Sequence, residues 1–215
     1  MPAIGKAISA YQKLQMDMIG KLSSSGENVL EEVPFYDEGY IFTQIERLKR
    51  EHENVSRDLK IAIELNAQSD CELQKRIQLK AKLDRIEVKM MYYAINSFRS
   101  LRLCKALVNG KDIKIVGLIQ ALEYYHEGNL AQAEEMFYRY FKENCVESAF
   151  YLGNKIYGKL LLNKGNTEEA LLHLEHAVQM KVNDKELLMM LQNAYQVMQK
   201  ELEKSIVDEI CQILG

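Results

Sequence analysis

The chain has 215 residues, 47% hydrophobic and 27% charged, and its 28 basic and 31 acidic residues give a net charge of −3. These values exclude intrinsic disorder and a low-complexity chain, and the net charge does not call for nucleic acid or an acidic membrane. The only prolines are Pro2 and Pro34, and there are 11 glycines. Because β and α/β folds need many Pro and Gly turns, this composition predicts an all-α fold with short connections.

Residues 1–37 are predicted to hold an amphipathic helix and an acidic linker. Apolar residues three and four apart mark one face over residues 1–22, and the polar cluster 23–26 ends the pattern. From residue 27 to 38 the chain has five acidic residues and no basic one. The amphipathic stretch lacks Trp and Phe, so we expect it to dock on protein and not on a membrane.

Cysteine spacing and charge placement bear on the compartment. The four cysteines lie far apart without a CxxC pair, which disfavours a zinc module and indicates a reducing compartment. Charged residues such as Lys13 and Asp17 interrupt any signal-peptide core, and no uncharged apolar run reaches transmembrane length. We therefore expect a cytoplasmic protein.

Residues 38–110 are predicted to form a long antiparallel helical hairpin. One helix begins near Asp37 and a second runs from Cys71 to Val108, with turn-forming residues at 66–70 between them. Apolar residues recur in each at steps of mostly four and three, the spacing of paired helices, and His52 is expected to be a half-buried, register-setting residue. The stripes are Ile41, Ile45, Leu48, His52, Val55, Leu59 and Ala62, then Leu79, Leu83, Ile86, Met90, Tyr93, Phe98 and Leu101.

The second predicted helix is strongly basic. Between Lys75 and Lys105 there are nine basic residues, opposed only by Asp84 and Glu87. No nucleic-acid motif accompanies them, so we expect a solvated face or one neutralised by residues 27–38 rather than a nucleic-acid surface. The apolar stripes can pair within one chain or between two, so a homodimer through the long helices remains open.

Residues 111–215 are predicted to contain shorter helices and an internal repeat. Setting Gly128 on Gly165 aligns two copies of a helix, a Gly-Asn turn and a second helix. Each first helix has a small residue, Ala121 or Gly158, which allows close helix approach, and the turn glycine can take a positive φ. The expected helices are 113–127, 130–144, 147–163, 167–181 and one long helix from Asp184 to Leu214.

These features resemble the tetratricopeptide repeat (TPR) family over about residues 114–200. Each second helix also has a small Ala followed four positions later by a bulky residue, Ala133 with Phe137 and Ala170 with Leu174. The spacing of the two turns is slightly longer than the roughly 34-residue period of that family. The resemblance implies a short right-handed helical-repeat array whose last long helix caps the open apolar face.

By this resemblance the first helices would line a concave groove with apolar and basic side chains. A groove of this kind suits a peptide or helix that carries apolar and acidic residues. The function we expect is therefore a non-enzymatic adaptor or scaffold that binds another protein. The groove positions are Leu118, Leu122, Tyr125, His126, Leu152, Lys155, Lys159, Leu162 and Asn163.

Familiar catalytic and metal-binding patterns do not occur in the sequence. It has no P-loop, GxGxxG, GxSxG, HExxH or EF-hand motif, so no enzyme activity, cofactor or small-molecule substrate is expected. His173 and His176 lie three apart, but zinc needs further ligands, and we expect a solvated helix face there. Two alternatives to the adaptor stay open: a secretion-type chaperone holding an apolar client segment, and a regulatory or accessory subunit of an enzyme complex.

Overall fold

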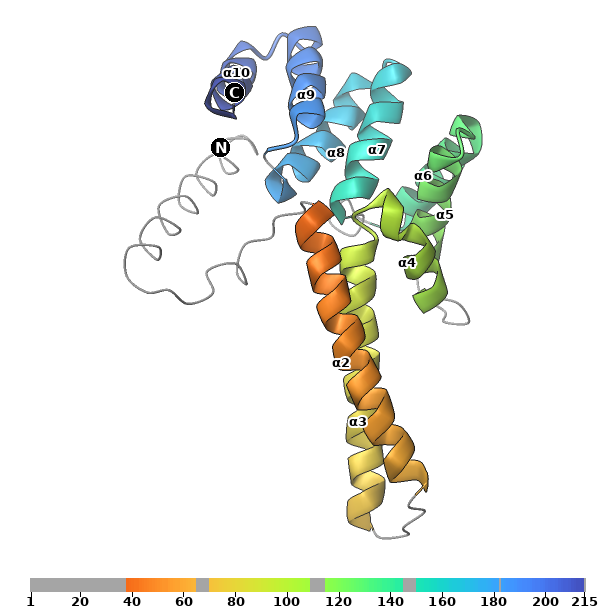
Figure 1. Cartoon of the computed structure of the whole chain (residues 1–215). Coiled ribbons are helices and arrows are strands. Elements are labelled where there is room, and N and C mark those ends of the chain that lie inside the picture. Colours follow the sequence, from red (N-terminus) through yellow and green to blue (C-terminus); the bar gives the residue numbers. More distant parts are fainter. Residues whose placement is uncertain (1–37, 65–69, 109–114, 145–149, 182, 215) are drawn as a thin grey trace, which may run out of the picture. The chain divides into compact units, whose positions relative to one another are not determined.

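The structure is a computed structural model, and it describes residues 38–64, 70–108, 115–144, 150–181 and 183–214 (Figure 1). Over these ranges all regular secondary structure is helical, which confirms the predicted all-α class. Two compact units contain the described residues, one within 37–119 and one within 120–215. The elements are α2 (Glu38–Glu64), α3 (Asp70–Ala94), η2 (Phe98–Ser100), α4 (Leu101–Val108), α5 (Val116–His126), α6 (Leu130–Glu143), α7 (Phe150–Asn163), α8 (Thr167–Met180), α9 (Lys185–Val197) and α10 (Glu201–Leu214).

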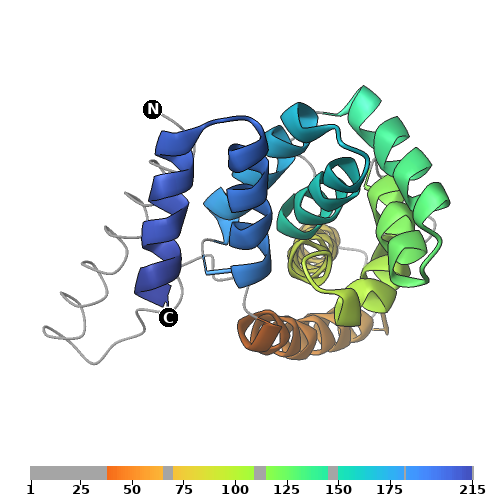
Figure 2. The same ribbon diagram turned by 90° about the horizontal axis from the view of Figure 1, so that it is seen from above.

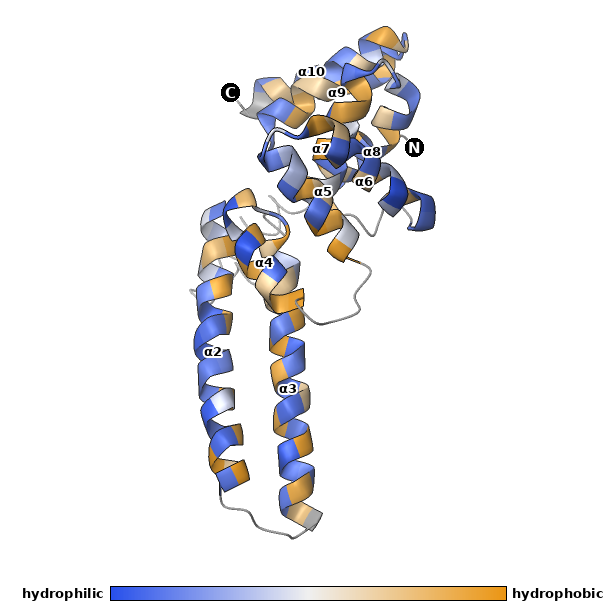
Figure 3. Cartoon of the chain, turned by 90° about the vertical axis from the view of Figure 1, so that its right-hand side faces the viewer, coloured by the Kyte–Doolittle hydropathy of each residue, from blue (hydrophilic) through white to orange (hydrophobic). Residues whose placement is uncertain are grey.

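Helices α2 and α3 form the predicted antiparallel hairpin (Figures 1 and 3). Three hydrogen bonds fix its register. The Ser97 hydroxyl donates to Glu38 at 3.2 Å, His52 Nε2 lies 3.3 Å from a Glu87 oxygen, and Arg76 Nε donates to the Ala62 carbonyl at 2.9 Å. These contacts join the start of α2 to the region beyond α3, and the end of α2 to the start of α3. His52 is half-buried, as expected from its place on the stripe.

The apolar stripes pack against each other along the hairpin. Leu48 and Val55 of α2 contact Ile86 and Met90 of α3, and all four are at most 4% exposed. Fully burying such a side chain contributes about 1.5–3 kcal/mol. Towards the connection the stripe residues are only partly covered, for example Leu79. The hairpin core is therefore strongest near the end where α2 begins.

The second hairpin helix does not run unbroken from Cys71 to Val108, so that prediction was wrong. It ends at Ala94, and Ser97 has an extended backbone with φ −141° and ψ 130° before the η2 turn. The Asn96 side chain donates to the Tyr92 carbonyl at 2.9 Å, in competition with the helical hydrogen bonds. Asn96 and Ser97 are buried at the break. Their polar side chains thus stabilise a bend where the sequence pattern suggested continuity.

Helices α7 to α10 pack in chain order, with contacts between α7 and α8, α8 and α9, and α9 and α10. In Figure 2 the two bluest helices, α9 and α10, lie side by side. Gly158 lets α7 approach α8 closely, because a Cβ there would lie 2.7 Å from the Leu174 side chain. This confirms the expected reason for a small residue at that position.

The predicted long helix from Asp184 to Leu214 was wrong, because it is two helices with a turn at residues 198–200. Gln199 has φ 55°, close to the φ of 82° at Gly128 and Gly165. In all three turns, the amide of the residue with positive φ donates to the carbonyl three residues earlier in the chain. The amide of the following residue donates to the carbonyl five residues before its own position. This is the hydrogen-bond pattern of a Schellman helix end. The same turn therefore closes α5, α7 and α9.

Candidate functional site

A row of charged and phenolic side chains crosses α5, α7 and α9. Lys159 of α7 bonds to Glu186 of α9, with 2.6 Å between Nζ and Oε1, and it also interacts with Tyr125 of α5. The hydrogen bond that Lys159 donates to Glu186 is the main cause that raises the pKa of Lys159. Lys159 and Glu186 are partly exposed, with 35% and 50% of their side chains accessible. This end of the row is therefore accessible to solvent.

The other end of the row is buried. Lys155 Nζ lies 2.7 Å from Asp184 and 2.6 Å from Glu186, and only 12% of its side chain is exposed. Asp184 caps α9 by accepting the Leu187 amide at 3.1 Å, and it also accepts the Tyr151 hydroxyl. Burial alone would raise the pKa of Asp184, but its hydrogen bonds, led by the one from Lys155, bring that pKa below its ordinary value. We name these six residues the polar row: Tyr125, Tyr151, Lys155, Lys159, Asp184 and Glu186.

Helix geometry explains how the row forms. Lys155 and Lys159 are four residues apart, so they project from the same face of α7. Asp184 and Glu186 lie at the positive end of the α9 dipole, where carboxylates are favoured. Both carboxylates also have lowered pKa values, and for Glu186 the hydrogen bonds from Lys155 and then Lys159 are the main causes. Asp184 and Glu186 are therefore ionised near neutral pH.

The structure divides the nine predicted groove residues into three groups. Leu118, Leu122 and Leu152 are at most 6% exposed, so as placed here they are core residues rather than a binding surface. Tyr125, Lys155 and Lys159 come together in the polar row. Half-buried Leu162 and exposed His126 and Asn163 lie near the C-terminal ends of α5 and α7. Sequence reasoning missed Asp184 and Glu186, although a capping Asp with Glu two positions later was a visible signal.

A second polar feature, the pair His173–Asn154, is buried among aromatic rings. His173 is 2% exposed, so its predicted solvated position was wrong. Its Nδ1 lies 2.9 Å from Asn154 Oδ1, and its ring meets those of Phe141 and Tyr157 at 4.4 and 4.8 Å between centroids. Burial is the main cause that lowers the pKa of His173 to about 4. The imidazole is therefore neutral near pH 7.

Within the described ranges, no three His, Cys, Asp or Glu side chains come close enough to hold a metal ion. His173 and His176 thus lack a third ligand among those residues. The buried pair serves packing instead, since a satisfied hydrogen bond lets the imidazole lie inside the core.

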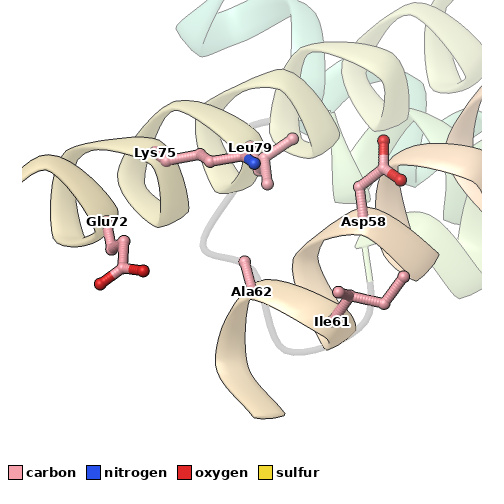
Figure 4. A pocket seen from close by; sticks show the side chains of 6 residues that line it. All are labelled: Asp58, Ile61, Ala62, Glu72, Lys75 and Leu79. Carbon is pink, nitrogen blue, oxygen red and sulfur yellow. The ribbon is translucent and has the colours of Figure 1, made fainter. Parts of the chain in front are cut away.

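Two shallow pockets lie along the hairpin. One of about 260 Å³ lies between α2 and α3 near their connection (Figure 4). It combines Ile61, Ala62 and Leu79 with the charged groups of Asp58, Glu72 and Lys75. A second of about 400 Å³ is bordered by basic side chains of α3, and its residues are Glu51, Gln78, Ala81, Lys82, Arg85, Ile86 and Lys89.

An open pocket of about 860 Å³ with both apolar and polar lining residues lies between the α7–α8 turn and the end of α9. Leu172 and Val197 line it and are 57% and 62% exposed, and Met198 lies beside them. Glu168 and Glu169 supply acidic groups to the same pocket. An apolar segment with basic residues would complement this surface.

Comparisons with protein-family models, curated proteins and solved structures found no match to this chain. None of the helices in the described ranges is both long and apolar enough to cross a membrane. Inferences about function therefore start from the polar row, the pockets and the repeated turns.

Proposed function

We propose that the chain is a non-enzymatic adaptor that binds a peptide or helix of another protein across α5, α7 and α9. The main support is the repetition of one turn, with the same hydrogen bonds, at Gly128, Gly165 and Gln199. Three helix pairs closed in the same way agree with the expected TPR-like array. In such an array the first helix of each pair faces a common binding surface.

The polar row gives this surface its chemistry. A partner carboxylate can replace Glu186 at Lys159, while Leu162, close by on α7, contacts an apolar partner residue. The buried pair of Lys155 and Asp184 holds α7 and α9 in place, since breaking a buried ion pair by removing one partner costs about 3–5 kcal/mol. The partner is therefore a segment with apolar and acidic residues.

Selection of random peptides on the full chain tests this function. We expect enriched peptides to carry acidic and apolar residues, and Lys159→Ala to weaken their binding about tenfold, equivalent to about 1.4 kcal/mol. The matched control is Lys164→Ala, because Lys164 lies in the turn directly after the same helix but pairs with Glu134. Failure to enrich any peptide would contradict the adaptor function, and equal binding by Lys159→Ala would exclude this surface.

The hairpin is proposed to be a rigid arm that closes within one chain. Its stripe residues Leu48, Val55, Ile86 and Met90 are already buried against each other, so these heptad positions are not available to a second chain at that end. Light scattering on a size-exclusion column should give the mass of one chain at all concentrations. A mass that doubles with concentration would instead support a homodimer through the long helices.

A chaperone for an apolar client is the second candidate, and the 860 Å³ pocket with exposed Leu172 and Val197 favours it. A chaperone should suppress the aggregation of reduced insulin B chain, measured by light scattering. Leu172→Glu with Val197→Glu should abolish that suppression and leave peptide binding at Lys159 intact. Absence of suppression by the unchanged protein counts against this candidate.

A further inference from the structure

Helix α3 is apolar on two opposite faces. One face packs on α2, but Leu73, Ile77, Val88 and Tyr92 lie on the other and are 41–60% exposed. Ala81 continues this stripe, and orange segments recur along α3 in Figure 3. At about 100° per residue, the exposed stripe lies roughly opposite the stripe of Leu79, Leu83, Ile86 and Met90. We name it the outer stripe.

Basic side chains flank the outer stripe. Lys82, Arg85 and Lys89 line the 400 Å³ pocket, together with Ala81 of the stripe. Lys82 pairs with Glu51 at 3.3 Å. Among the residues that the structure describes, no carboxylate forms an ion pair with Arg85 or Lys89. The combination of apolar and basic groups fits a segment that is apolar and acidic.

The chain contains such a segment directly before α2. Residues 27–37 include Glu27, Glu31, Glu32 and Asp37, no basic residue, and four apolar side chains. They lie outside the described residues, but their attachment point is known. Glu38 contacts Ser97 and Arg99, just beyond the end of α3. The segment therefore leaves the hairpin beside the Tyr92 end of the outer stripe.

Chain length permits the segment to reach this part of α3. Val88 lies about 9 Å along α3 from the last residue of that helix, Ala94, at 1.5 Å per residue. Eleven residues can extend over about 36 Å, enough to pass around a helix about 10 Å wide. Ile77 lies about 26 Å from Ala94. The residues between Glu31 and Glu38 extend over about 25 Å at most and must also pass around the helix, so Glu31 and Glu32 do not reach Ile77.

We propose that residues 27–37 pack on the outer stripe around Val88 and Tyr92, with their carboxylates at Arg85 and Lys89. A tethered segment of this length has an effective local concentration in the millimolar range, far above that of a separate partner. A second copy of α3 would bring like charges together. Nucleic acid would neutralise the basic residues but leave the apolar stripe uncovered.

The absence of tryptophan from the chain makes a direct test practical. Tyr92→Trp places a fluorophore on the outer stripe of the full chain. We expect it to resist acrylamide quenching and emit at short wavelength. Adding Glu31→Lys and Glu32→Lys should raise the quenching constant by about twofold or more, because the reversed charges are repelled by Arg85 and Lys89 and the tethered segment no longer covers the fluorophore. Ile77→Trp is the matched control, and the same two charge reversals should leave its quenching unchanged.

A charge exchange identifies the contact. Arg85→Glu with Lys89→Glu should expose the fluorophore, and combining these changes with Glu31→Lys and Glu32→Lys should restore its protection. Circular dichroism verifies that each variant keeps its helices. Equal quenching with and without the acidic residues would overturn the proposal. Protection of the fluorophore that increases with protein concentration would also overturn it, since this indicates a second copy of the chain. A fluorophore that is protected only after nucleic acid is added would overturn it as well.

Discussion

The hairpin and the C-terminal helices reach stability in different ways. Each hairpin helix has one main partner, so α3 leaves a whole face exposed, and the partly covered Leu79 shows how thin the core is. Helices α8 and α9 pack on both sides, and they bury polar groups such as His173 along with their apolar residues. A helix packed on two sides can therefore bury polar groups together with their hydrogen-bond partners. A two-helix hairpin has only one interface in which side chains can be buried.

The largest expected effect is in the interior of the C-terminal helices. Phe137 is fully buried and stacks on Tyr157 with 5.4 Å between ring centroids. Phe137→Ala should lower the free energy of unfolding by about 3–5 kcal/mol, measured by urea denaturation followed by circular dichroism. The adjacent Tyr138 is exposed, and Tyr138→Ala should change it by less than about 0.5 kcal/mol. Similar losses in both variants would show that this interior is not well packed.

The buried imidazole should make the C-terminal helices sensitive to acid. The pKa of His173 is about 4 when folded and about 6.5 when unfolded, so the unfolded chain binds more protons between these values. The contribution of His173 to the free energy of unfolding is therefore fully present above pH 6.5. It falls by about 3 kcal/mol as the pH drops towards 4. His173→Phe should flatten this slope in urea titrations, whereas exposed His126→Gln should keep it. A slope unchanged by His173→Phe would place its origin elsewhere.

Close approach of α7 and α8 should make Gly158 intolerant of a side chain. Gly158→Val brings methyl groups against Leu174 and should destabilise the protein by about 1–3 kcal/mol, seen as a lower melting temperature. Leu174→Ala opens space beside this position. Gly158→Val should therefore cost less stability in a Leu174→Ala background than in the unchanged protein. If the two losses add fully, the approach of the helices is not the cause.

The smallest expected effect is a gain at the third turn. Gln199 has a positive φ that glycine adopts without strain, so Gln199→Gly should stabilise the protein by up to about 1 kcal/mol. Gly165→Ala should destabilise the matching turn by about 1–2 kcal/mol, although its side chain would meet open space. Thermal melts of both variants compare the turns directly. A lower melting temperature for Gln199→Gly, or a higher one for Gly165→Ala, would contradict the shared geometry.

Local pattern predicted the hairpin well and the connections less well. The stripe from Ile41 to Val55 follows helical spacing, so its burial could be read from sequence. The break after Ala94 showed only as a five-residue step from Tyr93 to Phe98, because Asn96 and Ser97 act through buried hydrogen bonds. The turn at Gln199 was missed because glutamine is also common in the interior of helices.

The polar contacts were hardest to foresee. Lys155 and Lys159 were predicted as groove residues, but their partners Asp184 and Glu186 are about 30 residues away in the sequence. His173 lies among exposed neighbours such as Leu172, and its burial depends on Asn154 of another helix. Residue spacing within one helix contains no information about such pairs, which depend on how helices pack.

The glycine turns at Gly128 and Gly165 have a practical consequence. No heavy atom lies within 4 Å of a Cβ built at either position, so a side chain added there would point into open space. Short epitopes or fluorophore tags inserted there would displace no packed side chain, and exposed loop tips are where insertions are best tolerated. The protein therefore offers two natural labelling points, 37 residues apart in sequence, from which the bending of the helical stack could be followed by energy transfer.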